Sequence, residues 1–433
     1  MRSILLFGAG KSATMLIEYL LKNAKNGNWT LTIADSNFDL AKAKIAGSPY
    51  GIPVCTNVES ESDRNEIIEK ADIVISMLPP HLHILVAKDC IKFGKNLLTA
   101  SYVNDEIKSL ADRISEKKLL FLYEMGLDPG IDHMSALKIL DQIRGKGGLI
   151  TSFKSHCGGL VAPESDNNPW HYKISWNPRN VVTAGRDGAI FLEDGQMVKK
   201  TQKELFSASK SVLIKDLGSL SYYPNRDSLS YANIYGLDKV KTLIRTTLRY
   251  PSFISGWNTI LNLGLAEDTP TIETKNKTVK DVWAIFEKKI LSSSINKEVE
   301  EQLNFLGRND SQTIFPLEKT SASQFLQWCL ENKLVLNSND RDMIVMLHEI
   351  EYELNGASYL HKSQLLVKGE DQLHTAMAVT VGLPLAIVAE LILEGKINLN
   401  GLLIPTCKEI YEPVLQKLSA LGICFNEELL KIN

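Results

Sequence analysis

The stretch ILLFGAGKSA, residues 4–13, decides the fold of the first part of the chain. A short apolar run typical of a buried strand leads through two glycines into a segment with helical spacing, which is the G-x-G-x-x-A arrangement in its expected context. Such a loop lets the backbone approach a pyrophosphate, and the helix start attracts the phosphates. The stretch predicts cofactor contacts at Gly8, Gly10, Lys11, Ser12 and Ala13; the alternative is a tight structural turn without a ligand.

Asp35 ends the next apolar run, LTIAD at 31–35, about 20 residues beyond the glycine loop. An acidic side chain at this place accepts hydrogen bonds from the ribose hydroxyls of NAD and repels the 2′-phosphate of NADP. The following residues, 36–39, contain no arginine that could receive that phosphate, so Asp35 favours NAD. The alternative is that Asp35 caps the helix that follows it. Leu78 and Pro79, at the end of the run at 71–79, are further predicted cofactor contacts.

The rest of residues 1–126 repeats the same rhythm of strand and helix. Further continuous apolar runs lie at 71–79, 96–102 and 119–126, and helical patterns separate them at 12–24, 60–70, 82–93 and 104–117. Continuous rather than alternating apolar strands are typical of a parallel sheet covered by helices on both faces. The pattern predicts an α/β fold with a Rossmann-type, doubly wound parallel sheet.

The pattern changes after residue 126. A helix is predicted at 130–144, followed by strand-like segments near 149–157, 172–182, 197–205 and 211–216. Helical patterns then dominate at 280–291, 299–307, 320–334 and 340–354, and a long, very apolar helix spans 370–394. Residues 400–425 return to turn and helix. We expect this tail to fold back on the first domain, because its apolar face must be buried.

These segments predict three parts. The dinucleotide-binding domain comprises 1–126 and about 374–433, and a second, α+β substrate domain comprises 127–240 and about 350–373. A helical insertion occupies 241–349.

Composition excludes several classes of protein. Hydrophobic residues make up 44% of the 433 residues and the net charge is -3, which is ordinary globular composition without a field that would attract nucleic acid or an anionic membrane. No run reaches about 18 consecutive apolar residues, and the start of the chain reads poorly as a signal peptide. Six scattered cysteines lack zinc-ligand spacing and are expected to be reduced. We expect a cytoplasmic protein with a small-molecule partner and no nucleic acid or membrane.

Seven further segments carry a family resemblance: MLPPHLH (77–83), TASYV (99–103), GLDPGIDHMSA (126–136), SHCGG (155–159), WNPR (176–179), PNRDSL (224–229) and TLRYP (247–251). Together they resemble the L-glutamate-forming saccharopine dehydrogenases, also called saccharopine reductases, over nearly the whole chain. GLDPGIDH and TLRYP are the specific ones. The resemblance implies an oxidoreductase of lysine metabolism that interconverts saccharopine, NAD(P)+ and water with L-glutamate, 2-aminoadipate 6-semialdehyde and NAD(P)H, through an imine. Biosynthetic members of this family use NADPH, from which Asp35 departs.

The resemblance also implies site residues. Asp128, Tyr102 and Cys157 are the predicted catalytic residues, and the predicted substrate contacts are Ser101, Tyr102, Asp128, Arg226, Thr247 and Arg249. The two arginines suit substrate carboxylates, because a guanidinium forks onto a planar carboxylate. Arg179, Arg245 and Lys173 could supplement them and are left unassigned.

Each of these roles has an alternative in which the residue serves the structure only. Asp128 could cap the helix at 130–144, Cys157 could be an inert buried thiol, and an arbitrary arginine is often a solvated charge. His81 and His83 lack a third ligand with metal spacing, so no metal is expected and packing or capping roles are favoured, as for His133 and His374. Two other functions stay open: a carboxynorspermidine-type carboxyamine dehydrogenase, and a dinucleotide sensor without catalysis. A homodimer is expected because that is the commonest oligomer.

Overall fold

A computed structural model describes residues 1–287 and 295–432 of the chain. It divides into two compact units. Unit 1 comprises Met1–Lys146 and Leu373–Cys424, and unit 2 comprises Gly147–Gln372 and Phe425–Asn433, of which 288–294 and 433 lie outside the described residues.

Unit 1 is built on a seven-stranded sheet in the order β18-β6-β5-β4-β1-β2-β3. All neighbouring strands are parallel. Residues Ile4 to Phe7 of the first strand are at most 1% exposed, as expected for a strand covered on both faces. The strands are β1 (Arg2–Phe7), β2 (Trp29–Asp35), β3 (Gly51–Cys55), β4 (Ile73–Ser76), β5 (Asn96–Thr99), β6 (Leu120–Leu122) and β18 (Gly401–Leu403).

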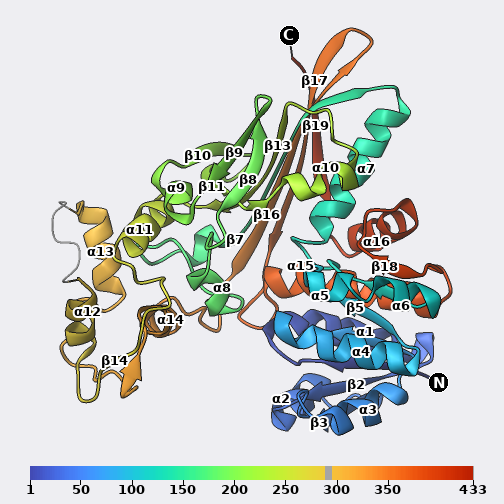
Figure 1. The fold of residues 1–433 in the computed structure, drawn as a ribbon, viewed down its shortest axis with the longest axis horizontal. Helices are drawn as coiled ribbons and strands as arrows, with labels where there is room; N and C mark the ends of the chain where they lie inside the picture. The colour runs from blue at the N-terminus through green and yellow to red at the C-terminus, as the bar shows by residue number, and fades with distance from the viewer. Residues whose placement is uncertain (288–294, 433) are drawn as a thin grey trace. The chain divides into compact units, whose positions relative to one another are not determined.

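Helices flank this sheet, as Figure 1 shows in blue and cyan for the first part of the chain and in orange and red for the last. They are α1 (Thr14–Gly27), α2 (Phe38–Ile45), α3 (Glu61–Glu69), α4 (His83–Phe93), α5 (Asp105–Lys108), α6 (Ala111–Glu116), α7 (Ile131–Gly145), α15 (Ala376–Leu393) and α16 (Lys408–Ala420), with short 3-10 turns η1 (Lys11–Ala13) and η2 (Pro80–Leu82). The predicted doubly wound parallel sheet is confirmed.

The long apolar helix α15 packs against α1 inside unit 1. A Cβ atom on Gly382 would lie 3.0 Å from the Ser12 carbonyl oxygen and the Leu16 nitrogen, so the two helices approach closely where this glycine lies. By length and composition α15 could cross a membrane, the one described helix of which that is true, yet 78% of its span is buried in the fold. The core helix of a folded domain has the same character.

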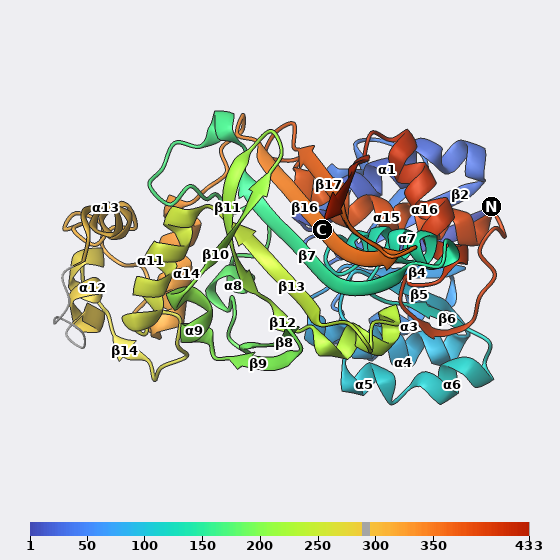
Figure 2. The same ribbon diagram turned by 90° about the horizontal axis from the view of Figure 1, so that it is seen from above.

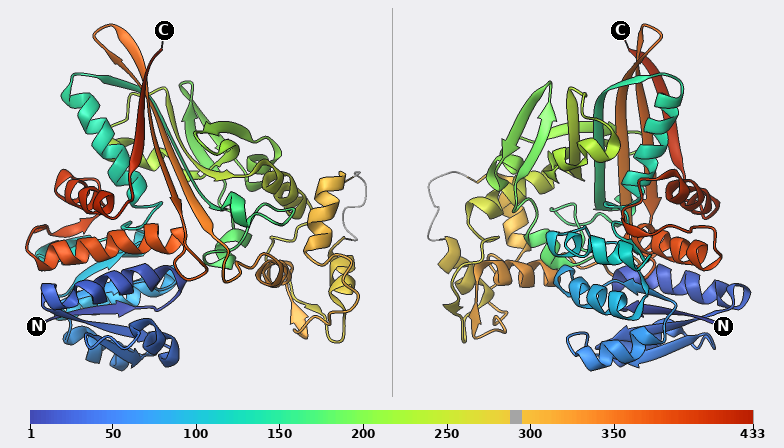
Figure 3. Two further views of the ribbon diagram at one scale, coloured as in Figure 1. Left: turned by 180° about the vertical axis from the view of Figure 1, so that it is seen from behind. Right: turned by 45° about the vertical axis from the view of Figure 1, so that its right-hand side comes forward.

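Unit 2 contains a ten-stranded mixed sheet whose main path runs β10-β11-β13-β7-β16-β17-β19. Figure 2 shows its long, curved central strands from above, and Figure 3 shows the C-terminal strand β19 beside β17. The strands are β7 (Leu149–Val161), β8 (Ala189–Glu193), β9 (Gln196–Lys200), β10 (Lys210–Ile214), β11 (Gly218–Pro224), β12 (Arg226–Asp227), β13 (Thr242–Arg249), β16 (Asp342–Leu354), β17 (Ala357–Lys368) and β19 (Phe425–Ile432).

The helices of unit 2 share one hydrophobic core with part of this sheet. That core includes Trp170, Phe253 and Trp257 together with Trp283 and Phe325 from the helical region. The helices are α8 (Pro178–Val182), α9 (Gln202–Ser207), α10 (Ala232–Tyr235), α11 (Pro251–Asn262), α12 (Val279–Glu287), α13 (Lys297–Phe305) and α14 (Ala322–Lys333), with 3-10 turns η3 (Pro163–Ser165) and η4 (Leu229–Tyr231) and a small ladder of β14 (Ile272–Glu273) and β15 (Lys319–Thr320).

Two predicted elements are wrong. The helix expected at 340–354 is the strand β16, which pairs antiparallel with both β7 and β17. Its residues Met343 to Leu347 are at most 2% exposed. A continuous apolar run of this kind is compatible with a buried helix or a buried strand, and here it is a strand buried between two neighbouring strands. The strand expected at 172–182 gives way to α8, because Asn177 caps its start and Pro178 occupies the first helical position.

Other elements differ in their bounds. The helix predicted at 104–117 is divided into α5 and α6, and the segment at 197–205 divides into β9 and α9, whose start carries a Thr201/Glu204 capping box. Residues 288–291 of the helix predicted at 280–291 lie outside the described residues.

The predicted domain bounds also differ from the two units. Helix α7 belongs to unit 1, whereas β19 at the end of the chain belongs to unit 2. The proposed insertion at 241–349 contains the central strand β13 at one end and part of β16 at the other, so its helical part is confined to about 251–333. That part shares the core of unit 2, because its apolar helices bury their faces there.

Candidate active site

The glycine loop leaves room for a ligand at the carboxyl edge of the parallel sheet of unit 1. Gly8 has φ +97°, and a Cβ there would lie 2.9 Å from the Met77 carbonyl oxygen at the end of β4. Gly10 is exposed, and a Cβ there would meet nothing within 4 Å, so the backbone is open to a phosphate at the helix start. Ala13 is fully buried where the helix packs. The residues present therefore fit a dinucleotide.

Asp35 contacts this loop directly. One carboxylate oxygen accepts a hydrogen bond from the Ala9 backbone N–H at 2.7 Å, and the other accepts from the Asn37 N–H at 2.9 Å. Asp35 is not the helix cap, since Asn37 caps α2 with its own side chain. Each carboxylate oxygen has a second acceptor position, so contact with a ribose stays chemically possible.

Leu78 and Pro79 lie on the same edge, directly after β4. Leu78 is half-buried against the core beneath the sheet, and Pro79 is exposed at the start of η2. The loop, Asp35 and these two residues therefore gather at one edge, where open α/β sheets bind ligands.

Tyr102 and Asp128 meet at the neighbouring part of this edge. The Tyr102 hydroxyl donates to Asp128 Oδ1 at 3.3 Å. Asp128 does not cap α7, because Gly130 is the cap residue and Asp132 is the carboxylate that accepts the Gly130 N–H, at 2.6 Å. The N-cap residue of α7 is therefore Gly130 rather than Asp128.

Sequence reasoning missed Glu124 near this pair and expected only packing or capping roles for His83 and His133. Glu124, buried and with φ +57°, accepts the Val103 N–H at 3.2 Å and contacts His133 Nε2 at 2.9 Å. His83 lies between Ser76 and Ser101. A buried acidic residue with positive φ, such as Glu124 after strand β6, is typical of a functional site, but its φ angle cannot be read from the sequence.

In unit 2, the register of the strands places three predicted residues on one face of the sheet. Thr247 of β13 pairs with Cys157 of β7, and paired residues point to the same face. Arg249 lies two residues further along β13 and so shares that face. Cys157 is buried at this position and is not part of a disulfide.

Tyr223, which sequence reasoning also missed, belongs to the same face because it pairs in register with Thr247. Its phenol is buried, and burial raises its pKa, while the Arg249 charge and a hydrogen bond with the Thr247 side chain oppose that rise.

Arg249 has an unusual environment. It is 4% exposed, and its guanidinium carbon lies 5.3 Å from the Tyr172 ring centre and 5.5 Å from that of Phe253. One terminal nitrogen donates to the Leu248 carbonyl at 2.7 Å, while Nε has no hydrogen-bond partner among the residues that the structure describes. No carboxylate of the described chain pairs with it. A buried cation without a carboxylate is poised for an anionic ligand.

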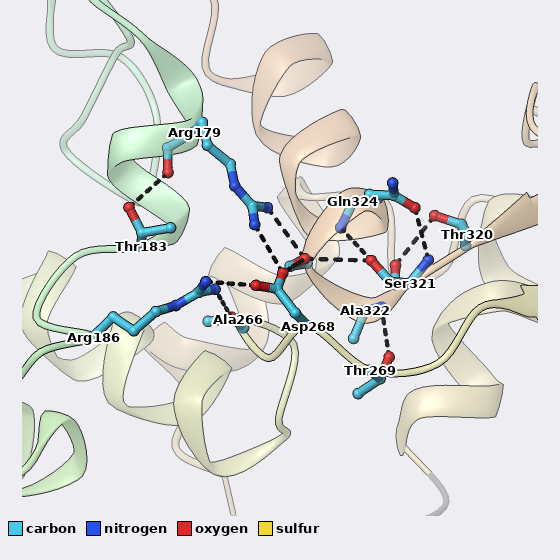
Figure 4. A network of polar contacts seen from close by, with 11 residues as sticks. Arg179, Thr183, Arg186, Ala266, Asp268, Thr269, Thr320, Ser321, Ala322 and Gln324 are labelled. Carbon is cyan, nitrogen blue, oxygen red and sulfur yellow. Dashed lines mark hydrogen bonds and ion pairs between the residues drawn. The ribbon is translucent and has the colours of Figure 1, made fainter. Parts of the chain in front are cut away.

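The other arginines differ. Arg226 is 59% exposed at its side chain, has φ +52° and lies 4.0 Å from Asp187, so the structure does not place it in the buried setting of Arg249. Lys173 is buried against Asp340 at 2.5 Å. Arg179 belongs to the Asp268 cluster, defined as Asp268 with Arg179, Arg186 and Ser323. Figure 4 shows the two arginines directed at Asp268.

Groups of three or more His, Cys, Asp or Glu that could hold a metal ion are absent from residues 1–287 and 295–432.

The parallel sheet with its glycine loop and acidic edge defines a dinucleotide-binding protein of the Rossmann type. The chain matches the Saccharopine dehydrogenase NADP binding domain over residues 4–122 and the Saccharopine dehydrogenase C-terminal domain over 126–423. It therefore belongs to the saccharopine dehydrogenase family.

Individual relatives agree with this. The chain is 33% identical to saccharopine dehydrogenase [NADP(+), L-glutamate-forming] of Schizosaccharomyces pombe, with 99% of each chain covered. It is 32% identical to the mitochondrial alpha-aminoadipic semialdehyde synthase of Mus musculus, covering 99% of this chain and 48% of that one. The apo structure of saccharopine dehydrogenase (L-Glu forming) from Saccharomyces cerevisiae matches with a TM-score of 0.88 at 30% identity, over 99% of this chain and 100% of that one.

Proposed function

We propose that this protein is an L-glutamate-forming saccharopine dehydrogenase, which interconverts saccharopine, NAD(P)+ and water with L-glutamate, 2-aminoadipate 6-semialdehyde and NAD(P)H. The observation that carries the proposal is Arg249, a buried guanidinium without a carboxylate on the same sheet face as Cys157 and Thr247. Saccharopine bears three carboxylates, and the family membership supplies the reaction.

In the oxidative direction, the carbon beside the secondary amine loses a hydride and the nitrogen loses a proton, which leaves a C=N bond. Water then adds to the imine carbon, and the C–N bond breaks to release L-glutamate and the aldehyde. The nicotinamide cofactor, which the glycine loop and Asp35 would hold, would supply the acceptor for this hydride.

The chain's own residues bind the substrate and manage its protons. Asp128 is the proposed acceptor of the amine proton, and Tyr102, which donates to it, holds its orientation. Ser101 contacts the substrate beside Tyr102. In unit 2, Arg249 binds a carboxylate, Arg226 and Thr247 are further proposed contacts, and Cys157 is proposed near the reacting carbon.

We further propose that the cofactor is NAD rather than NADP. Asp35 supports this, since its carboxylate faces the glycine loop and would repel a 2′-phosphate. The NADP(+) in the names of the yeast relatives argues the other way. The test compares kcat/KM for the two cofactors in wild type and in Asp35→Ser combined with Ser36→Arg. A wild-type preference for NADP of tenfold or more, about 1.4 kcal/mol, would contradict the assignment.

The direct test of the function is turnover. Purified protein with saccharopine and NAD or NADP should produce reduced nicotinamide, followed by absorbance, together with stoichiometric L-glutamate. A carboxynorspermidine-type dehydrogenase would instead turn over carboxynorspermidine, and a sensor would bind dinucleotide without turnover of either substrate. Either result would overturn the proposal.

We also propose a cytoplasmic homodimer that binds neither nucleic acid nor membrane. The six cysteines form no disulfides, which supports a reducing compartment. The net charge of -3 supports the expectation that the protein is not attracted to polyanions.

The dimer is supported by strand β19, which is the last strand of its sheet and whose Leu429 is 57% exposed. An edge strand can pair with a second copy of the chain. Light scattering that gives a monomer mass at micromolar concentration would overturn the dimer, and cell fractionation tests the compartment.

A further inference from the structure

A chain of three hydrogen-bonded side chains runs beneath the carboxyl edge of unit 1. The Ser76 hydroxyl at the end of β4 lies 2.8 Å from His83 Nδ1, and His83 Nε2 lies 2.7 Å from the Ser101 hydroxyl. Ser76 is fully buried and His83 is 2% exposed, while Ser101, two residues beyond the end of β5, is half-buried. The chain therefore connects the interior of the domain to the segment that carries Tyr102.

The direction of these hydrogen bonds follows from the protons available. Burial lowers the pKa of His83 to about 4, and the nearby His81 charge adds to the effect, so the ring is neutral at pH 7 and carries one N–H. The Ser76 hydroxyl has no hydrogen-bond partner other than His83 in the described part of the chain, and it has no access to water. Its O–H must donate to Nδ1, because a buried donor left unpaired costs about 1–3 kcal/mol. The ring proton is then on Nε2.

His83 Nε2 consequently donates to the Ser101 oxygen. The Ser101 hydrogen then cannot point back at the ring, so the hydroxyl of this half-buried residue can donate to a ligand. The opposite tautomer would leave Ser101 as an acceptor only.

The backbone of this segment is held from other sides. The Ser101 N–H donates to Thr99 Oγ1 at 3.2 Å, and the Ser101 carbonyl accepts the Glu124 N–H at 3.0 Å. Glu124 in turn accepts the Val103 N–H. With the backbone fixed, the rotation of the Ser101 hydroxyl is the remaining freedom, and His83 removes it.

We propose that His83 is a positioning residue that orients the Ser101 hydroxyl to donate to a carboxylate oxygen of the amino-acid substrate, an assignment that rests on the proposed function. A carboxylate is the strongest acceptor for the Ser101 hydroxyl, because charge-assisted hydrogen bonds are about twice as strong as neutral ones. The other acceptor chemistry at such an edge, the carboxamide oxygen of the cofactor, is distinguished by the experiment below.

The first measurement tests the tautomer and needs no activity. Proton–nitrogen correlation spectra of protein labelled with 15N histidine, with His83→Gln identifying the resonance, should show His83 protonated at Nε2 at pH 7. A ring protonated at Nδ1 would overturn the proposal.

The second measurement uses kinetics. Ser101→Ala and His83→Phe should each raise the KM for saccharopine about 10- to 100-fold, the loss expected for a hydrogen bond to a charged group. The KM for the dinucleotide should change less than about twofold. The double variant should have nearly the same KM for saccharopine as the more impaired of the two single variants, because both substitutions remove the same interaction. His81→Asn, at the exposed histidine of the same turn, is the matched control and should behave as wild type.

His83→Gln protects the test against misfolding, since its amide can still donate toward Ser101 and should recover part of the loss. An increase in the dinucleotide KM instead of the saccharopine KM would assign Ser101 to the cofactor and overturn the proposal. Absence of turnover in wild type is the failure of the proposed function instead, and the tautomer measurement still decides the geometry.

Discussion

Two sets of arginines in unit 2 differ in how their charge is matched. In the Asp268 cluster, the carboxylate accepts from Arg179 at 2.8 Å, from Arg186 at 2.6 Å and from Ser323 at 2.6 Å (Figure 4). These contacts hold the pKa of Asp268 well below its ordinary value; the Ser323 and Arg179 hydrogen bonds come first among the causes. Every charge there is satisfied from within the chain.

Arg249 is the opposite case. It is far more buried than Arg179, lies on aromatic rings and has an unpartnered Nε. A structural arginine pairs with a carboxylate of the same chain, whereas a ligand-binding arginine pairs with a carboxylate of the ligand. The comparison teaches that burial without a matching charge, rather than arginine itself, is what supports Arg249 as the proposed substrate contact.

The strongest way to break this comparison is Arg249→Ala. Loss of one partner of a buried charged contact costs about 2–5 kcal/mol, so kcat/KM for saccharopine should fall at least about 30-fold while dinucleotide binding is retained. Arg249→Lys should recover little, because an ammonium cannot fork onto a carboxylate. Arg186→Ala is the matched control and should leave the KM for saccharopine near its wild-type value. Unchanged steady-state constants in Arg249→Ala would remove it from the site.

The carboxylates extend the comparison. Asp128→Asn should lower kcat/KM roughly 100-fold or more, the lower range for a positioned acid–base group, with little change in Tm. Asp132→Asn is the structural counterpart, since Asp132 holds the Gly130 N–H at the start of α7, and it should lower Tm more. Near-normal turnover in Asp128→Asn would return Asp128 to a structural role.

Arg226 sharpens the comparison because the same family resemblance selects it and the structure exposes it. Its side chain is 59% exposed, and an exposed charge is screened by water, so Arg226→Ala should raise the KM for saccharopine less than about tenfold. Steady-state kinetics beside Arg249→Ala make the test. An effect as large as that of Arg249→Ala would show that exposure is a poor guide here.

The smallest effect is expected at Asp268. Asp268→Asn should lower Tm by a few degrees and leave kcat/KM unchanged, because the carboxylate is half-exposed and its contacts are screened. Since the folded-state pKa lies below the ordinary 3.8, the stabilisation is complete above pH 4 and disappears as the pH falls through the lowered value. Thermal melts of both proteins from pH 7 to pH 3 should show a Tm difference that is constant near neutral pH and narrows below about pH 4. A Tm difference that grows toward low pH would contradict this.

The fold of unit 1 followed from the sequence because its signals are local. Each strand is a short buried run, and each helix follows it with its own spacing, so period and glycine position indicate the order of elements. Strand β3 at Gly51–Cys55 was missed, since its Pro53 and exposed Ile52 weaken the pattern of a buried strand. Unit 2 was harder, because its sheet joins strands far apart in sequence, such as β7 with β13 and β16.

The candidate site divides in the same way. The glycine loop, Asp35, Tyr102 and Asp128 were selected from sequence, and their catalytic and binding roles stay predictions. The contacts that Asp35 makes with Ala9 and Asn37, the place of His83 between two serines and the pairing of Tyr223 with Thr247 were not readable, since each depends on residues brought together by folding.

The sequence by itself determined the parallel α/β domain, its dinucleotide loop and the family, because these depend on local spacing and on short characteristic segments. Only the tertiary structure decided that residues 342–354 form a strand and that Arg249 is buried while Arg226 is exposed. It also decided that Asp268 forms an ion pair with Arg179. The physical reason is that burial and charge pairing are properties of neighbours in space. An apolar run or an arginine has the same local sequence signal whether its partners lie beside it or a hundred residues away.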